Sequence, residues 1–138
     1  MSYLLDTNVV SELARPKPSP RVLTWFESVR SDALSVSVLT LGEIRKGVEK
    51  LTDTKRREKL RLWLEADLPE WFGPRILSID AAVADRWGRM LAEIGRPMPS
   101  IDSLLAATAL HYGLRLVTRN DADFTYPGLD VVNPWTAA

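Results

Sequence analysis

Short apolar runs alternate with longer helical patterns along the whole chain. The runs have the length of strands, and they lie at 3–5, 34–38, 76–79, 114–118 and 129–132. Strands that alternate with helices indicate a parallel sheet covered by helices. We therefore predict an α/β fold of one domain over 1–138, with a short central, mainly parallel sheet and helices on both faces.

Proline, glycine and capping residues set the predicted helix bounds. The pattern Thr40-x-x-Glu43 has the spacing of a capping box, Asp80 precedes a helix as its cap, and Gly95 and Gly113 end two helices. Pro69 begins a break after a helix of basic character. The predicted helices cover 7–14, 21–29, 40–50, 54–67, 81–94 and 101–112.

Composition excludes several classes of site. The 138 residues contain no cysteine, so disulfides, zinc–thiolate sites and cysteine nucleophiles are absent. The single histidine, His111, excludes paired-imidazole acid–base chemistry within one chain. No apolar run approaches the ~20 residues of a membrane-spanning helix, and the N-terminus has no signal-peptide pattern. We expect a cytoplasmic protein with no membrane contact.

Acidic residues occupy the places where a parallel sheet gathers its ligands. Asp6 follows the first strand, Glu43 and Asp102 lie near the starts of helices, and Asp121 and Asp123 follow the fourth strand. Each has a structural alternative, as a helix cap, a capping-box member, a first-turn acid or a turn residue. Together they would repel one another unless a cation lay among them.

Carboxylates without histidine or cysteine suit a hard cation, Mg²⁺ or Mn²⁺, and the chain is therefore interpreted as a metal-dependent enzyme. Neighbouring polar side chains could orient the carboxylates, and Arg119 could hold a phosphate or balance the acids. These polar candidates are Thr7, Asn8, Ser11, Thr118 and Asn120.

A basic segment adds a candidate surface for nucleic acid. The chain as a whole is neutral, with 18 basic and 18 acidic residues, but 45–61 contains eight basic and only three acidic residues. Arg45 and Lys46 are its members nearest to Glu43 in sequence, and we take them as candidate phosphate contacts. The alternative is an ordinary solvated helix surface.

Several of these segments, taken in order, resemble PIN-domain nucleases. They are Leu4-Leu5-Asp6-Thr7-Asn8, the helical Glu43, Asp102, Thr118-Arg119-Asn120-x-x-Asp123-Phe124 and Val131-Val132-Asn133-Pro134-Trp135. More narrowly, the chain resembles the VapC/FitB-type toxins of bacterial type II toxin–antitoxin modules, and the resemblance covers essentially its whole length.

The resemblance implies a PIN-like fold and a ribonuclease that cleaves RNA with water activated by Mg²⁺. Asp6 and Asp102 would be the principal Mg²⁺ ligands, and Glu43 would complete the acidic centre. The motif spacing favours Asp123 as the fourth acid, with Asp121 as the alternative. The resemblance also implies an RNA substrate, a VapB-type antitoxin partner that blocks the acidic pocket, and a homodimer.

Two other functions fit parts of the sequence. Five tryptophans suggest a partner-binding module with weak or no nuclease activity, and Trp71 is the one that we expect to be exposed. A Mg²⁺-dependent phosphatase or phosphotransferase would also place an Asp after the first strand. It is disfavoured because position 8 is Asn and no lysine lies beyond Lys59.

Overall fold

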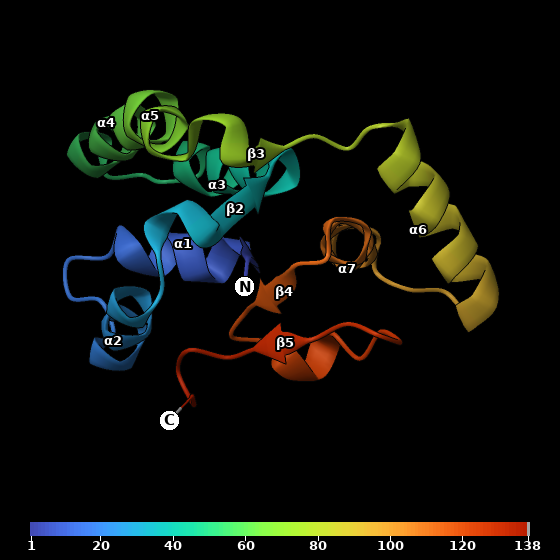
Figure 1. Cartoon of the computed structure of the whole chain (residues 1–138). Coiled ribbons are helices and arrows are strands. Elements are labelled where there is room, and N and C mark those ends of the chain that lie inside the picture. Colours follow the sequence, from blue (N-terminus) through green and yellow to red (C-terminus); the bar gives the residue numbers. More distant parts are fainter. Residues whose placement is uncertain (138) are drawn as a thin grey trace.

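A five-stranded parallel sheet forms the centre of the molecule (Figure 1). The computed structural model describes residues 1–137, and the last residue of the predicted domain, Ala138, lies outside them. The strand order is β3-β2-β1-β4-β5, and every neighbouring pair is parallel, which confirms the predicted class of sheet. The strands are β1 Tyr3–Leu5, β2 Leu34–Ser37, β3 Ile76–Leu77, β4 Arg115–Val117 and β5 Val131–Val132.

The order of the strands reverses at β1. Strands β2 and β3 extend the sheet on one side of β1, whereas β4 and β5 extend it on the other. Open α/β sheets bind their ligands beyond the carboxyl ends of the strands at such a reversal. The register pairs Leu5 with Val117, so that Asp6 and Thr118 both follow at the same edge of the sheet.

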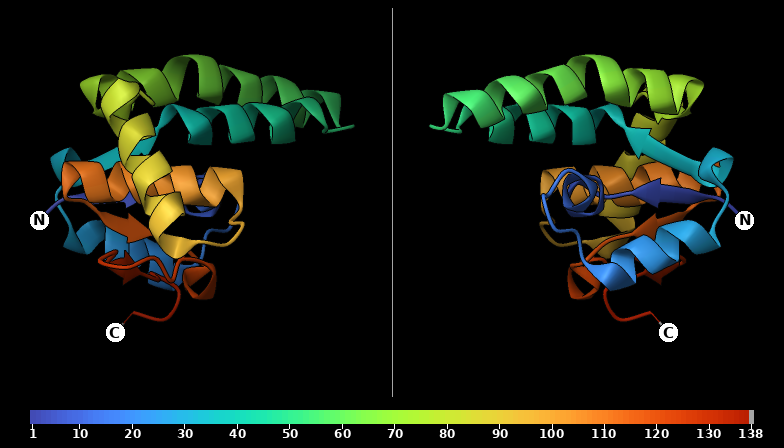
Figure 2. Two further views of the ribbon diagram at one scale, coloured as in Figure 1. Left: turned by 90° about the vertical axis from the view of Figure 1, so that its right-hand side faces the viewer. Right: turned by 90° about the vertical axis from the view of Figure 1, so that its left-hand side faces the viewer.

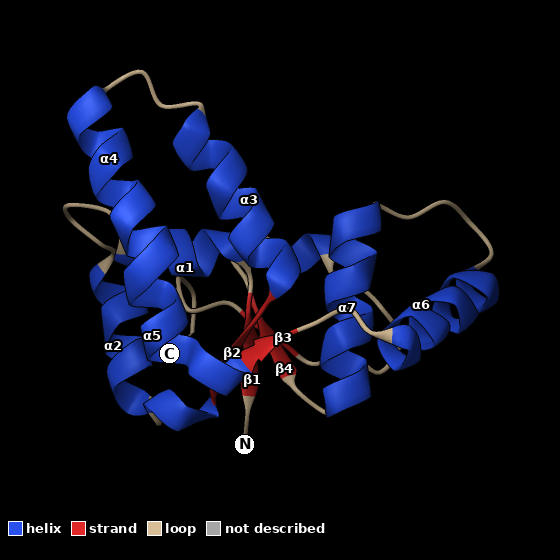
Figure 3. Cartoon of the chain, turned by 90° about the horizontal axis from the view of Figure 1, so that it is seen from above, coloured by secondary structure: helices blue, strands red, loops and turns tan. Residues whose placement is uncertain are grey.

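Helices cover both faces of the sheet, as predicted (Figure 3). Helices α1 to α5 lie on one face, where α3 and α4 form a hairpin that projects beyond the sheet (Figure 2), and α7 with α6 lies on the other. Among residues 1–137, none of the helices has the length and apolar character needed to cross a membrane. The helices are α1 Thr7–Leu13, α2 Pro20–Ser28, α3 Val38–Glu49, α4 Thr54–Leu62, α5 Leu68–Phe72, α6 Ala81–Ile94 and α7 Ser100–Tyr112.

Side-chain alternation along the strands divides the core in two. Leu5 and Val117 face α1 to α5, whereas Leu4 and Leu116 face α6 and α7, and none of the four is exposed to solvent. Successive residues of a strand point to opposite faces of the sheet, so each central strand contributes to both cores. The edge of the sheet at which Asp6 lies is therefore formed by strands that are packed on both faces.

The predicted capping box at the start of α3 is wrong. The helix begins at Val38 rather than at residue 40, and its cap is Ser37, whose Oγ accepts a hydrogen bond from the backbone N–H of Leu39 at 3.1 Å. Thr40 lies inside the first turn and is fully buried. Glu43 is thus in the second turn, where its carboxylate is not needed for capping.

The predicted helix break at Pro69 is also wrong. Helix α4 runs into a π-helical turn, Trp63–Asp67, which leads directly into α5. In this wider turn the N–H of Leu68 donates to the carbonyl of Trp63, five residues back. The shifted register accommodates a proline that cannot donate a hydrogen bond.

The tryptophans are mostly part of the core. Trp25, Trp63 and Trp135 pack against the α1–α5 core, and Trp87 packs against the α6–α7 core. Trp71 is the exception at 46% exposure, as predicted, and the guanidinium of Arg75 lies 5.0 Å from the centre of its ring.

Core packing predicts a stability difference between two leucines. Leu105 of α7 is completely buried, whereas Leu62 of α4 is 64% exposed. We expect Leu105→Ala to lower the free energy of unfolding by about 2–5 kcal/mol and Leu62→Ala to change it by less than about 0.5 kcal/mol. Chemical denaturation of both variants checks this, and equal losses would contradict the assigned packing.

Candidate active site

Asp6 is held at the carboxyl end of β1 by bonds to both of its side-chain oxygens. Its Oδ1 accepts a hydrogen bond from the N–H of Thr7 at 2.7 Å, and its Oδ2 accepts one from the hydroxyl of Thr118 at 2.8 Å. The backbone N–H of Asp6 donates to the carbonyl of Val117 at 2.9 Å. With 7% exposure, Asp6 is a buried carboxylate whose position depends on β4 as well as on β1.

Asn8 joins the two chain segments that follow β1 and β4. Its amide nitrogen lies 3.3 Å from the hydroxyl oxygen of Thr118, to which it donates, and 3.5 Å from Oδ2 of Asp6. Its side-chain oxygen accepts from the backbone N–H of Arg119 at 3.1 Å. Asn120 completes the arrangement, because its N–H donates to the Thr118 hydroxyl oxygen at 3.1 Å.

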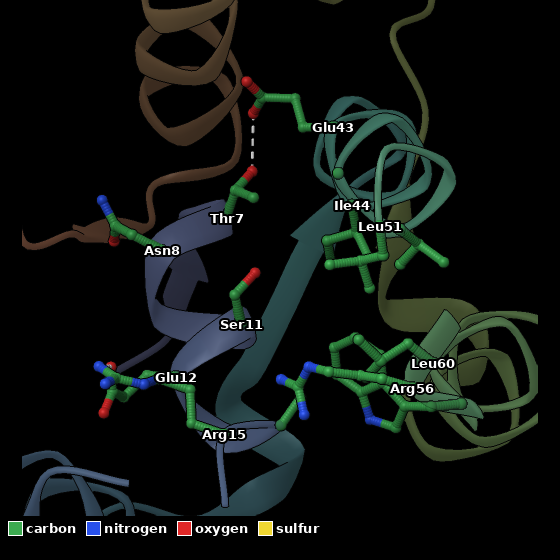
Figure 4. Close-up of a pocket in the computed structure, with 14 residues that line it drawn as sticks. Thr7, Asn8, Ser11, Glu12, Arg15, Glu43, Ile44, Leu51, Arg56 and Leu60 are labelled. Carbon is green, nitrogen blue, oxygen red and sulfur yellow. Dashed lines mark hydrogen bonds and ion pairs between the residues drawn. The ribbon is translucent and has the colours of Figure 1, made fainter. Parts of the chain in front are cut away.

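Glu43 reaches the same edge from α3. The hydroxyl of Thr7 donates to its Oε1 at 2.7 Å, as the dashed line in Figure 4 shows. This bond links the start of α1 to the second turn of α3. Within residues 1–137 the other carboxylate oxygen of Glu43 accepts no hydrogen bond from a side chain or backbone group.

Four carboxylates at this edge of the sheet lie near enough for their charges to affect one another. Burial raises the pKa of Asp102, and the negative charges of Asp6, Asp123 and Glu43 raise it further. Burial also raises the pKa of Asp6, against the lowering effect of its bonds from Thr118 and Thr7. We refer to Asp6, Glu43, Asp102 and Asp123 as the acidic site.

Asp121 has a different environment from Asp123. Its Oδ1 accepts a hydrogen bond from the side-chain amide of Asn133, across 3.4 Å. The charge of Asp123, and not that of Asp121, contributes to the raised pKa of Asp102. The two acids lie in one short turn after β4, and of the two it is Asp123 whose charge acts on Asp102.

The donor atoms of the acidic site fit a hard divalent cation. All four side chains offer carboxylate oxygens, and within residues 1–137 none of them lies within 4.0 Å of a basic group. No three metal-ligating side chains in the described part of the chain share one coordination sphere. Carboxylate oxygens are the donors that Mg²⁺ accepts in proteins, commonly from one or two side chains with waters in the remaining positions.

The remaining polar candidates differ in their contacts. Thr7, Asn8, Thr118 and Asn120 belong to the hydrogen-bond network around the acidic site. Ser11 lies one turn further along α1 and faces a groove (Figure 4), and within residues 1–137 its side chain forms no hydrogen bond to an acidic residue.

A groove between α1 and the α3–α4 hairpin opens beside the acidic site (Figure 4). We call it the α1–α3 groove. It has a volume of about 460 Å³, and Thr7 and Glu43 lie at one end, while Arg56 and Leu60 line it further away (Figure 4). Its wall on α1 is fixed by Glu12, a buried carboxylate that accepts from the N–H of Ser19 at 2.8 Å and pairs with Arg15 at 3.1 Å.

The basic residues predicted to contact phosphate differ in the ion pairs that they form. Arg45 pairs with Glu49 and with Glu65, at 3.1 and 2.9 Å, so it belongs to a solvated helix surface. Arg61 also binds Glu49, and the pKa of that carboxyl falls to about 2. Lys46 forms no ion pair with any residue of 1–137.

The contacts of Arg119 and Asn133 with the C-terminal segment were not predicted from the sequence. The guanidinium of Arg119 lies 5.1 Å from the ring centre of Trp135. Asn133 donates to the carbonyl of Arg119 at 3.1 Å and accepts from the N–H of Trp135 at 3.0 Å, so it ties the turn after β4 to the C-terminal segment. The Asn-Pro pair at 133–134 was a sign of such a turn, because Asn side chains bond to the backbone two residues on.

Comparison with known proteins identifies the class. The sequence profile of the PIN domain matches residues 3–127, and the chain therefore belongs to the PIN domain family. A VapC ribonuclease from Sinorhizobium fredii is 32% identical over 138 residues, which are 98% of this chain and 99% of that protein. Toxin FitB from Neisseria gonorrhoeae is 35% identical over 135 residues, 96% of this chain and 97% of the toxin.

Solved structures give the same result. The chain superposes on the crystal structure of FitAcB from Neisseria gonorrhoeae with a TM-score of 0.88 and 34% identity, covering 98% of this chain and 99% of that one. A toxin–antitoxin complex from Klebsiella pneumoniae gives a TM-score of 0.70 and 27% identity, covering 96% and 98%. These likenesses confirm the resemblance to VapC/FitB-type proteins.

The repulsion within the acidic site predicts a stabilising substitution. The folded-state pKa of Asp102 is raised above its ordinary value of 3.8. Stability from this group is therefore fully present below that value and is lost as the pH rises through the folded-state pKa. In metal-free buffer we expect Asp102→Asn to unfold at a higher temperature than the wild type at pH 7, with the difference shrinking toward pH 4.

Thermal unfolding in EDTA at several pH values checks this expectation. Asp67→Asn is the matched control, because Asp67 is exposed and lies outside the acidic site. A lower unfolding temperature for Asp102→Asn at pH 7 would show that the carboxylates do not repel one another.

Proposed function

We propose that this protein is a metal-dependent endoribonuclease that acts as the toxin of a type II toxin–antitoxin pair. The observation that carries the proposal is the meeting of four carboxylate charges, without a basic partner within residues 1–137, at the carboxyl edge of a PIN fold. The names of its relatives, a VapC ribonuclease and a toxin, support both halves of it.

In this proposal Asp6 and Asp102 hold Mg²⁺, or Mn²⁺ in its place, and Glu43 and Asp123 complete the acidic centre. When bound there, such an ion would lower the pKa of a water and offset negative charge on the phosphate of the cleaved bond. Thr118 and Thr7 favour the charged form of Asp6, since their hydrogen bonds lower its pKa against the effect of burial. Asn8 orients the Thr118 hydroxyl that makes one of these bonds.

A carboxylate or a second water has to accept the proton. His111 is nine residues beyond Asp102 on α7, a separation of about 13 Å along the helix axis. It is therefore too far from Asp102 to act as a base at the acidic site.

The partner in this proposal is a VapB-type antitoxin. A neutralising segment that entered the α1–α3 groove would reach Glu43 and Thr7 at its inner end, where a basic side chain could pair with the acidic site. The solved toxin–antitoxin complex from Klebsiella pneumoniae, which has the same fold, supports this assignment. The proposal includes a cytoplasmic location and a homodimer.

Cleavage of a structured RNA tests the enzyme. We expect cutting by purified protein with Mg²⁺ or Mn²⁺ and none with EDTA. Asp6→Asn should lower the rate by more than about 100-fold, because even residues that only orient metal ligands cost 10–100-fold. A folded Asp6→Asn variant that still cuts would contradict the assignment, and no cutting by the folded wild type under either metal would favour a partner-binding module.

The two acids after β4 give a matched pair of variants. We expect Asp123→Asn to lower the cleavage rate about 10-fold or more, because its charge acts on the acidic site. Asp121→Asn should cut at close to the wild-type rate, since Asp121 is bonded to Asn133. Initial rates at saturating Mg²⁺ measure both effects, and the opposite order would make Asp121 the fourth acid.

A further inference from the structure

A second groove opens from the acidic site on another side of α3. It has a volume of about 610 Å³ and lies between α3 and the start of α7. We call it the α3–α7 groove. Thr7 and Glu43 line both this groove and the α1–α3 groove, so the two meet at the hydrogen bond between these residues. Whatever lies in the α3–α7 groove is therefore adjacent to the acidic site.

Two lysines give this groove a positive wall. Lys46 and Lys50 are four residues apart and so lie on one face of the helix, both exposed. Neither forms an ion pair with any residue of 1–137. In the same basic segment, Arg45 and Arg61 are held by glutamates. The two lysines are thus available to a negatively charged ligand.

The rest of the groove is apolar and open. Val38 from α3 and Ile101 from α7 contribute side chains that are 38% and 37% exposed. Gly42 lies between Val38 and Lys46 on the helix face, and a Cβ added there would meet no atom within 4 Å. Ile101 directly precedes Asp102, so this apolar surface extends to the acidic site.

We propose that the α3–α7 groove is a subsite for single-stranded RNA next to the cleaved bond. Lys46 and Lys50 bind phosphates that flank the bond, and a base packs on Val38 and Ile101. Phosphates with unpaired lysines, and the apolar faces of bases with exposed apolar side chains, are the matching chemistries. The inference rests on the proposed ribonuclease function and adds the path by which the strand leaves the acidic site.

Binding of a short labelled single-stranded RNA, measured by fluorescence anisotropy in EDTA, tests the lysines without cleavage. We expect Lys46→Ala combined with Lys50→Ala to weaken binding about 10-fold at low salt. The slope of log affinity against log salt should fall by about 1.4, because each phosphate contact on a single strand contributes about 0.7. Lys55→Ala with Lys59→Ala is the control, with the same charge change and spacing on α4 outside the groove.

Filling the groove tests the apolar part. Gly42→Leu places a side chain in the groove where its Cβ meets no atom, and Gly88→Leu does the same on an exposed part of α6. We expect Gly42→Leu to weaken RNA binding and raise KM about 10-fold, because the leucine occupies the space of a stacked base. Gly88→Leu should match the wild type in RNA binding and KM. Both variants should unfold at a slightly higher temperature, because leucine favours a helix over glycine by roughly 1 kcal/mol.

The outcomes separate this inference from the proposed function. If the wild type cuts RNA and both groove variants bind RNA as tightly as the wild type, the subsite is wrong and the proposed function stands. The same result accompanied by loss of a protein partner, or by a change in oligomeric state, assigns the groove to a protein contact and also overturns it. A wild type that neither binds nor cuts RNA overturns both.

Discussion

The pairing of β1 with β4 is the constraint on which the rest of the site depends. It brings together residues 112 positions apart, so that the Thr118 hydroxyl donates to Asp6. The same register allows Asn8 to bond to both segments. A shift of one residue would turn each side chain to the opposite face of the sheet and would separate these groups. The two buried cores on either side of the sheet make such a shift costly, so the chemistry of the edge is secured by apolar packing far from it.

The acidic site keeps negative charges close together, which lowers the stability of the folded protein. Asp6 and Asp102 both have raised pKa values, first because burial disfavours the carboxylate and then because neighbouring carboxylates repel it. A protein that needed these residues only as helix caps would gain nothing from placing them together. The protein instead keeps them close, and hydrogen bonds from Thr7 and Thr118 oppose the rise that burial causes in the pKa of Asp6. A cation bound at such a site would remove repulsion as well as form bonds.

Much of this arrangement was predictable from the sequence, and the failures have physical causes. Periodicity located all five strands and the long helices, and parallel topology explained why Asp6 and Asp102 should approach. The capping box failed because Ser37, at the end of β2, supplied a cap three residues earlier. The motif spacing favoured Asp123 over Asp121, but it could not show that Asp121 is bonded to Asn133, which follows β5. Nor could composition show that glutamates bind Arg45 and Arg61 while Lys46 forms no ion pair within residues 1–137.

The turn between α1 and α2 affects how a partner binds in the α1–α3 groove. Three prolines stand at 16, 18 and 20, and the turn is closed by Glu12, which holds Ser19 and Arg15. Prolines restrict the backbone before any partner arrives, and the buried carboxylate fixes the direction in which α2 leaves. The α1 side of the α1–α3 groove is therefore held in place by bonds within the chain. A segment that enters it meets a wall that is already ordered, so less of the entropic cost of association falls on the protein.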